Sequence, residues 1–125
     1  MSNKNSLEGA KLAYLALDDK LAEGIRVLDI SKISTLCDYF VIASGSNSNQ
    51  LKAMADAVDE KLYKAGFVLK HTEGIQTHNR NWVLMDFGDI VVHLFNKDDR
   101  EFYSLERIWG DARELTVDEL TDSQN

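Results

Sequence analysis

The stretch WVLMDFGDIVVHLF, residues 82–95, decides more of the fold than any other part of the chain. Two runs rich in strand-forming residues flank Gly88 and Asp89, and a glycine at the first turn position is typical of a type II′ hairpin. The register that this turn sets pairs Met85 with Val92. Because strand side chains alternate between faces, the hairpin has two faces of different composition.

The first face of the hairpin is entirely apolar and is expected to lie on the core. Its members are Val83, Met85, Phe87, Ile90, Val92 and Leu94. The second face mixes large apolar groups with a carboxylate and an imidazole. Its members are Trp82, Leu84, Asp86, Val91, His93 and Phe95. This mixture suits a protein-binding surface, whereas cover by a C-terminal helix is the alternative, and both interpretations stay open.

Upstream of the hairpin, the sequence predicts a strand, a helix and a second strand in succession. A β-rich apolar run occupies residues 38–44, and the polar turn 44–49 can cap the start of a helix. Apolar residues at helical spacing follow over 50–65, and Gly66 is a helix stop. A strand over 67–71 completes a βαβ unit.

The remaining segments follow the same periodicities. A helix is predicted over 7–21 and a strand over 25–30, near the N-terminus. A polar loop is expected over 72–81, and a last helix over 98–113.

Together these elements predict one α/β domain over residues 1–113, with a mixed sheet of about five strands and flanking helices. Residues 114–125 are rich in Asp and Glu, and we expect them to form a flexible acidic tail.

The composition limits the classes of function. The chain has 125 residues, a net charge of −7 and a single cysteine, Cys37, so no internal disulfide can form. No apolar run approaches the ~20 residues of a membrane span, and the N-terminus lacks a signal-peptide pattern. We therefore expect a cytoplasmic protein that avoids nucleic-acid phosphates and favours a basic protein partner.

Catalytic and metal-binding patterns are weak. A Gly-Ser turn at Gly45 and the carboxylates of Asp86 and Asp89 resemble parts of a nucleotidyltransferase site. However, two carboxylates of one strand share a metal only at even spacing, and Asp89 falls in the turn. The histidines have no zinc-ligand spacing, and Cys37 is expected to be a buried, inert thiol. We expect no catalysis, no metal and no cofactor.

Three ordered motifs resemble the ribosomal silencing factor family, also called Iojap-like or RsfS. The first is DYFVIASGSNS at 38–48, the second is the hairpin at 82–95, and the third is REFYSLERIWGDA at 100–112. The pair Glu73 and Gly74 also fits. The resemblance covers residues 6–113.

The resemblance implies a sheet related to the nucleotidyltransferase fold, without that activity. It implies a bacterial protein that binds the large ribosomal subunit through its fourteenth protein, at the subunit interface. A factor bound there sterically blocks joining of the small subunit and damps translation when nutrients are scarce. Relatives form dimers, so a homodimer is a second expected state.

Combining the hairpin pattern with the resemblance selects two sets of residues. The expected partner-binding residues are Trp82, Leu84, Asp86, His93, Tyr103, Glu106 and Trp109. The expected supporting residues are Asp38, Gly45, Glu73, Gly74 and Arg100. Trp109 falls on the apolar stripe of its predicted helix, which favours a core position, and Asp38 is placed to cap a turn.

Two other classes of function compete with ribosome binding. A cryptic nucleotidyltransferase would bind Mg²⁺ and a nucleotide at residues 44–47 and at Asp86. A self-assembling module would form a stable homodimer through the mixed face and would not associate with ribosomes.

Overall fold

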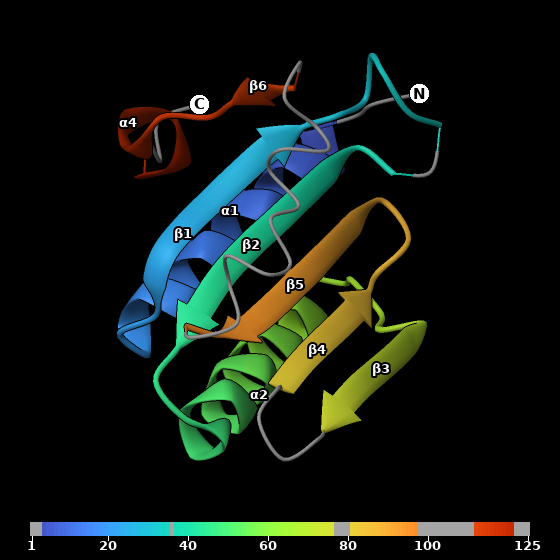
Figure 1. Cartoon of the computed structure of the whole chain (residues 1–125). Helices are drawn as coiled ribbons and strands as arrows, with labels where there is room; N and C mark the ends of the chain where they lie inside the picture. The colour runs from blue at the N-terminus through green and yellow to red at the C-terminus, as the bar shows by residue number, and fades with distance from the viewer. Residues whose placement is uncertain (1–3, 36, 77–80, 98–111, 122–125) are drawn as a thin grey trace.

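Two long helices cover one face of a six-stranded sheet in the computed structural model (Figure 1). The structure describes residues 4–35, 37–76, 81–97 and 112–121. The elements are α1 (Lys4–Asp19), β1 (Glu23–Asp29), β2 (Tyr39–Gly45), α2 (Ser48–Lys64), β3 (His71–Gln76), β4 (Asn81–Asp86), β5 (Ile90–Asn96), β6 (Arg113–Glu114) and α4 (Val117–Thr121). The prediction of one α/β domain with a mixed sheet is confirmed.

The strand order is β3-β4-β5-β2-β1-β6, and β2 with β5 is the one parallel pair among these neighbours. β2, α2 and β3 form the predicted crossover, and β3 runs in the same direction as β2. The two strands are not adjacent, because β5 and β4 lie between them. The sheet is mixed because the antiparallel β4–β5 hairpin lies between β2 and β3, the two strands that the crossover connects.

The third predicted strand is shifted along the chain. It was expected over 67–71, with a loop over 72–81, but β3 occupies 71–76. The polar composition of this segment suggested a loop. However, β3 is an edge strand, and edge strands often carry polar and charged side chains. Its hydrogen bonds to β4 hold it in the sheet.

The hairpin register is confirmed. Met85 faces Val92, and Leu84 faces His93. Gly88 has a φ of +94°, and the Phe87 amide donates to the Ile90 carbonyl across 2.9 Å. A positive φ favours glycine at this turn position, which is why the sequence at 87–90 closes the two strands so tightly.

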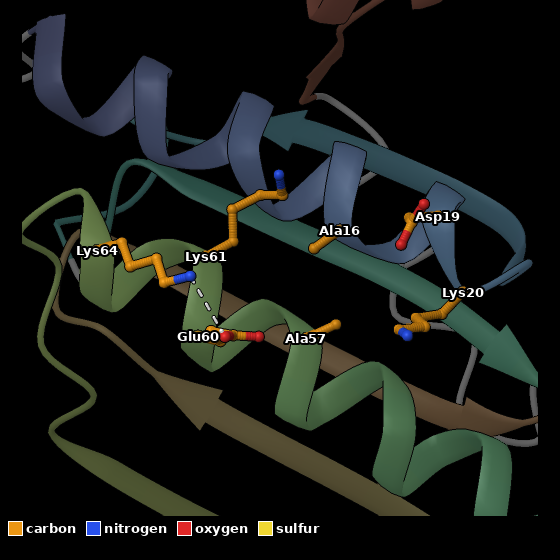
Figure 2. A pocket seen from close by; sticks show the side chains of 7 residues that line it. All are labelled: Ala16, Asp19, Lys20, Ala57, Glu60, Lys61 and Lys64. Atoms are coloured by element: carbon orange, nitrogen blue, oxygen red, sulfur yellow. Dashed lines mark ion pairs between the residues drawn. The ribbon is translucent and has the colours of Figure 1, made fainter.

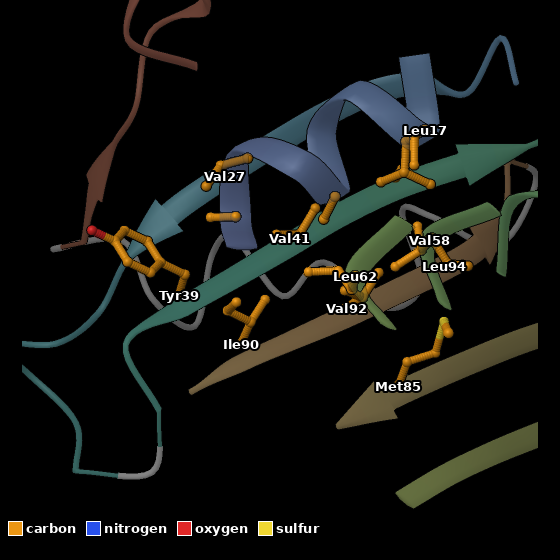
Figure 3. Close-up of a cluster of buried hydrophobic side chains, with 14 of the residues drawn as sticks. Leu17, Val27, Tyr39, Val41, Val58, Leu62, Met85, Ile90, Val92 and Leu94 are labelled. Carbon is orange, nitrogen blue, oxygen red and sulfur yellow. The ribbon is translucent and has the colours of Figure 1, made fainter. Parts of the chain in front are cut away.

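The inner face of the sheet, under α1 and α2, carries the main hydrophobic core (Figure 3). Met85, Val92 and Leu94 of the hairpin are buried there as predicted, whereas Val83 is only partly buried. From the helices, Leu17, Val58 and Leu62 point toward these strands. Burial of such side chains contributes about 1.5–3 kcal/mol each, so this face supplies much of the stability.

The C-terminal segment corrects the expectation of a flexible tail from residue 114. β6 pairs with β1, and the side chains of Leu115 and Leu120 are buried in the main core. Thr116 and Glu119 form a capping box, in which each side chain binds the backbone amide of the other. This Thr-x-x-Glu pattern is visible in the sequence but is obscured there by the surrounding acidic residues.

Candidate partner-binding face

The outer face of the sheet, opposite α1 and α2, holds four of the seven predicted partner-binding residues. Trp82, Leu84 and Asp86 come from β4 and are partly exposed, while His93 comes from β5 and is buried. The hairpin register places all four on this one face, as alternation predicts. Within the described part of the chain, both long helices lie on the other face (Figure 1).

A row of stacked rings crosses the outer face. The ring of His93 lies nearly parallel to those of Trp82 and Phe95, with centroids 6.1 and 6.3 Å away. The Phe40 ring meets the imidazole edge-on at 5.0 Å. Of these rings, Phe40 and Phe95 belong to a second apolar cluster with Leu28, Ile30, Cys37 and Ile42, and Trp82 packs against it. The outer face is therefore partly a second core and partly an accessible surface, so both interpretations of its composition hold in part.

His93 is the most unusual residue of this cluster. Its side chain is 5% exposed, and within the described residues neither ring nitrogen has a hydrogen-bond partner. Burial lowers the pKa of the imidazole from 6.5 to about 4, so the ring is neutral at physiological pH. A neutral imidazole has one acceptor and one donor nitrogen, and both lack a partner in this part of the chain.

An open pocket of about 480 Å³ lies beside the β4–β5 turn on the same face. Its apolar wall is formed by Phe40, Leu84 and Val91, and its polar groups are Lys70, Asp86 and His93. Lys70 was not among the predicted site residues, because its segment was interpreted as an interior strand. The pairing of Lys70 with the end of β4, through its amide and the Asp86 carbonyl, brings it here.

Two predicted residues near the pocket have local structural partners. Asp86 accepts a hydrogen bond from the Gly88 amide at 2.7 Å and so holds the hairpin turn. Asp38 directly precedes β2, and its amide donates to the Asp89 carbonyl. Its Oδ2 is buried and has no hydrogen-bond partner within the described residues, so the expected capping role does not account for that oxygen.

The other supporting residues lie away from the pocket. Gly45 ends β2, where a Cβ atom would come within 3.1 Å of Met54 and Leu51, so the glycine permits close packing of α2. Glu73 is exposed on the edge strand and binds His71 at 2.8 Å. Gly74 has room for a side chain, since the nearest atom to its Cβ position is 4.0 Å away.

Four predicted residues, Arg100, Tyr103, Glu106 and Trp109, lie outside the described residues, as does the helix predicted over 98–113. Their contribution to the face remains a prediction from the sequence.

The two halves of a nucleotidyltransferase-like site do not come together. Asp86 lies level with Val91 of β5, whereas Gly45 lies level with Asn96. Five residues of strand separate these levels, which is roughly 16 Å. The Asp86 side chain also faces outward, and α2 packs on the inner face.

Two backbone amides at the start of α2, those of Ser46 and Gln50, have local side-chain partners. The Asn47 side chain accepts from the Gln50 amide, and the Gln50 side chain accepts from the Ser46 amide. The Gln50 side-chain amide in turn donates to the carbonyls of Lys20 and Leu21 at the end of α1. These contacts occupy two of the backbone amides with which a helix N-terminus would bind phosphate.

The described residues offer no reactive thiol, no metal-ligand cluster and no membrane-spanning helix. Burial, reinforced by the charge of Asp38, raises the pKa of the Cys37 thiol to about 12, so no thiolate nucleophile forms at neutral pH. Within the described residues, no cluster of three or more His, Cys, Asp or Glu side chains could hold a metal ion. No helix in those ranges has the length and apolar character that a bilayer crossing requires.

A second hollow, of about 240 Å³, lies between α1 and α2 on the far side of the molecule (Figure 2). It is lined by two alanines, three lysines and two carboxylates, which are Ala16, Ala57, Lys20, Lys61, Lys64, Asp19 and Glu60. Lys64 pairs with Glu60 at 3.4 Å. The mixed charges make this hollow a weaker candidate for a binding site than the outer face.

The comparisons with known proteins agree on one family. The chain matches the family described as ribosomal silencing factor during starvation over residues 3–125. It is 44% identical over 102 residues to the ribosomal silencing factor RsfS of Bacillus subtilis. The aligned region covers 82% of this chain and 85% of that protein. It is 41% identical to RsfS of Halalkalibacterium halodurans, with 90% and 92% covered. A crystal structure of a Chromobacterium violaceum protein superposes with a TM-score of 0.76 at 39% identity, over 82% of this chain and 84% of that one.

Proposed function

The chain belongs to the ribosomal silencing factor family, and from this premise we propose that it binds the large ribosomal subunit and sterically blocks the small subunit. Its direct partner would be the basic protein at the subunit interface that is fourteenth in the large-subunit naming. Translation would be repressed in this way under nutrient limitation, in the cytoplasm. Contact with ribosomal RNA would be slight, because the net charge of −7 is repelled by phosphates.

The observation that carries this proposal is the composition of the outer face. It combines partly exposed aromatic and aliphatic groups, Trp82 and Leu84, with the carboxylate of Asp86. Aromatic anchors surrounded by a few charges are typical of the centre of a protein–protein interface. The carboxylate of Asp86 at such a face can pair with a cationic side chain of a basic ribosomal protein.

Binding without catalysis is the second part of the proposal. The carboxylate of Asp86 and the turn at Gly45 are at opposite ends of the sheet. At the start of α2, the Ser46 amide donates to the Gln50 side chain and the Gln50 amide donates to the Asn47 side chain. Calorimetric titration with Mg²⁺ and a nucleoside triphosphate should give no saturable heat, and micromolar binding that Asp86→Ala abolishes would contradict this part.

A sucrose-gradient profile with the tagged protein tests the main proposal. We expect the protein to co-sediment with free large subunits and to be absent from small subunits and joined ribosomes. Adding it to separated subunits should reduce the peak of joined ribosomes in proportion to its occupancy. Sedimentation with joined ribosomes, or with no ribosomal particle, would contradict the proposed mechanism.

A homodimer through the same outer face is a second state that we propose, because an apolar face can also bury itself against a copy. Such a dimer would compete with ribosome binding. Analytical ultracentrifugation at rising concentration should show it, and an excess of large subunits should then dissociate it.

A further inference from the structure

We propose that the pocket beside the β4–β5 turn receives one basic side chain of the ribosomal partner, whose charged end is bound by the carboxylates of Asp38 and Asp86. This inference rests on the proposed function and names the chemistry of its central contact. Phe40, Leu84 and Val91 would pack against the methylene stem of the incoming side chain. A long basic side chain suits such a pocket because its stem is apolar and its end is a multiple donor.

The first argument is the lack of partners for two buried polar groups. Oδ2 of Asp38 and both nitrogens of His93 have no hydrogen bond within the described residues. A buried polar atom without a partner costs roughly 1–3 kcal/mol, and more when it is charged. Such atoms are rare in folded proteins, so a donor supplied by a bound partner explains their presence here.

His93 lines the pocket and is nine-tenths or more buried, with 5% of its side chain exposed. Because the imidazole is neutral, one ring nitrogen is an acceptor that can receive an N–H from a cationic group. The stacked rings of Trp82 and Phe95 hold the imidazole plane in place. The acceptor therefore has a defined direction before any partner binds.

The sign of the local charge favours a cation. Asp38, Asp86 and Asp89 all lie close enough to Cys37 to add to the increase in its thiol pKa, after the larger effect of burial. Asp38 and Phe40 are two positions apart, so their side chains share the outer side of β2. Asp86 lines the pocket and Asp38 adjoins Cys37, which also lines it, so these two carboxylates lie at the end of the sheet where the pocket opens, whereas Asp89 is in the exposed turn and does not line it.

Lys70 is the opposing charge on the pocket wall. Its Nζ lies over Gly88, 2.9 Å from the position that a Cβ would take there. Within the described residues it makes no ion pair, so its ammonium would repel an incoming cation and attract an anion. The effect of removing Lys70 therefore distinguishes a basic occupant from an acidic one.

The test measures affinity for isolated large subunits by co-sedimentation of purified full-length variants. Asp38→Asn keeps the shape and removes the charge, and Asp86→Asn keeps an oxygen acceptor for the Gly88 amide. Asp89→Asn is the matched control, because it changes the net charge equally at an exposed position of the same turn. Asp38→Asn and Asp86→Asn should each weaken binding at least about tenfold, and Asp89→Asn less than about twofold.

Two further variants test the charge of the occupant and the acceptor nitrogen of His93. Lys70→Gln should tighten binding severalfold, and His93→Phe, which keeps the stacking but removes the acceptor, should weaken it. Asp38→Asn should also raise the urea midpoint of unfolding, since it removes the charge of a carboxylate whose buried Oδ2 has no partner within the described residues. A loss of affinity together with a gain in stability would separate a binding role from a structural one.

The failures of the two proposals are distinguishable. If wild-type protein does not bind large subunits, the proposed function is wrong. If wild type binds and Asp38→Asn and Asp86→Asn bind equally well, the basic side chain does not enter this pocket. Weaker binding by Lys70→Gln would show that the occupant is anionic and would also overturn the inference.

Discussion

The inner and outer faces of the sheet are built from the same strands but differ in how completely their polar atoms are satisfied. Under α1 and α2, the buried side chains of the inner face, such as Val41, Val92 and Leu62, are almost all apolar. On the outer face, His93 is buried and Asp38 is partly buried, and both ring nitrogens of His93 and the buried Oδ2 of Asp38 have no hydrogen-bond partner in the described residues. Stability alone would replace these two groups with apolar ones.

The contrast teaches where to look for function in a protein of this size. A face selected only for packing becomes uniformly apolar, since each unsatisfied polar atom reduces the free energy of unfolding. A face that keeps such atoms beside a pocket is constrained by something other than stability. In this chain that constraint is best explained by a partner.

The largest expected effect belongs to the inner face. Leu62→Ala should lower the free energy of unfolding by about 3–5 kcal/mol, because Leu62 is fully buried and its removal leaves a cavity. Urea denaturation followed by circular dichroism measures the change. Tyr63→Ala, its exposed neighbour on α2, should cost less than about 1 kcal/mol. Equal losses from the two variants would mean that α2 does not pack as described.

The outer face should be sensitive to acid through His93. The unfolded imidazole has the ordinary pKa of 6.5 and the folded one has a pKa of about 4, so the unfolded chain binds the proton first as the pH falls. Stability should be complete above pH 6.5 and should decrease toward pH 4 by about 3 kcal/mol.

Urea midpoints measured between pH 7 and pH 4 test this expectation. His93→Phe cannot titrate, so its curve should be flatter over this range than that of wild type, and subtraction removes the contribution of the carboxylates. Identical curves would mean that the imidazole is not desolvated in solution.

The C-terminal segment extends the inner face, and Leu120 measures how much it contributes. Leu120→Ala should lower the free energy of unfolding by about 2 kcal/mol, at the low end for a buried leucine, because a short terminal helix can relax. Val117→Ala in the same helix alters an exposed side chain and should be nearly neutral. If thermal melts show no difference between the two variants, α4 is not docked on the core.

Trp82→Ala tests the outer face through its affinity for large subunits, whereas the preceding variants test the free energy of unfolding. Truncating a central aromatic anchor commonly costs about 2 kcal/mol, which is about a thirtyfold loss of affinity for large subunits. Tyr63→Ala, which removes an exposed aromatic ring from α2, should bind like wild type. Co-sedimentation compares the two after circular dichroism confirms folding, and the reverse order of effects would move the interface to the helices.

The smallest effect is expected at the sheet margin, where Arg26 of β1 binds Glu114 of β6 through both carboxylate oxygens. Both side chains are about two-fifths exposed, at 39% and 43%, so water and salt screen the pair. Arg26→Gln should cost less than about 1 kcal/mol, and a double-mutant cycle with Glu114→Gln measures the coupling. A coupling well above this value would show that the pair is needed to hold β6.

Much of this architecture could be predicted from residues 82–95. The turn at Gly88 and the alternation of side chains determine the register, and the register determines which side chains share a face. The helices could be predicted in the same way, from their apolar stripes and from Gly66, which adopts the expected positive φ after α2. These are local patterns, with periods of a few residues.

Non-local contacts were harder to predict. β3 has little apolar character, because an edge strand is held mainly by hydrogen bonds to β4. β6 spans only Arg113–Glu114, and its pairing with β1 joins positions more than 80 residues apart. The burial of Leu115 and Leu120 depends on that pairing, so an acidic composition suggested a tail where a packed segment exists.

The sequence by itself determined the family, through three motifs, and the two faces of the hairpin, through alternation. Only the tertiary structure decided which polar groups of the outer face are buried and which are paired. It placed Asp86 and Gly45 at opposite ends of the sheet, and it brought Lys70 and Asp86 to the pocket beside His93. The physical reason is that burial and pairing depend on neighbours from distant segments, whereas alternation and turn geometry depend on adjacent residues.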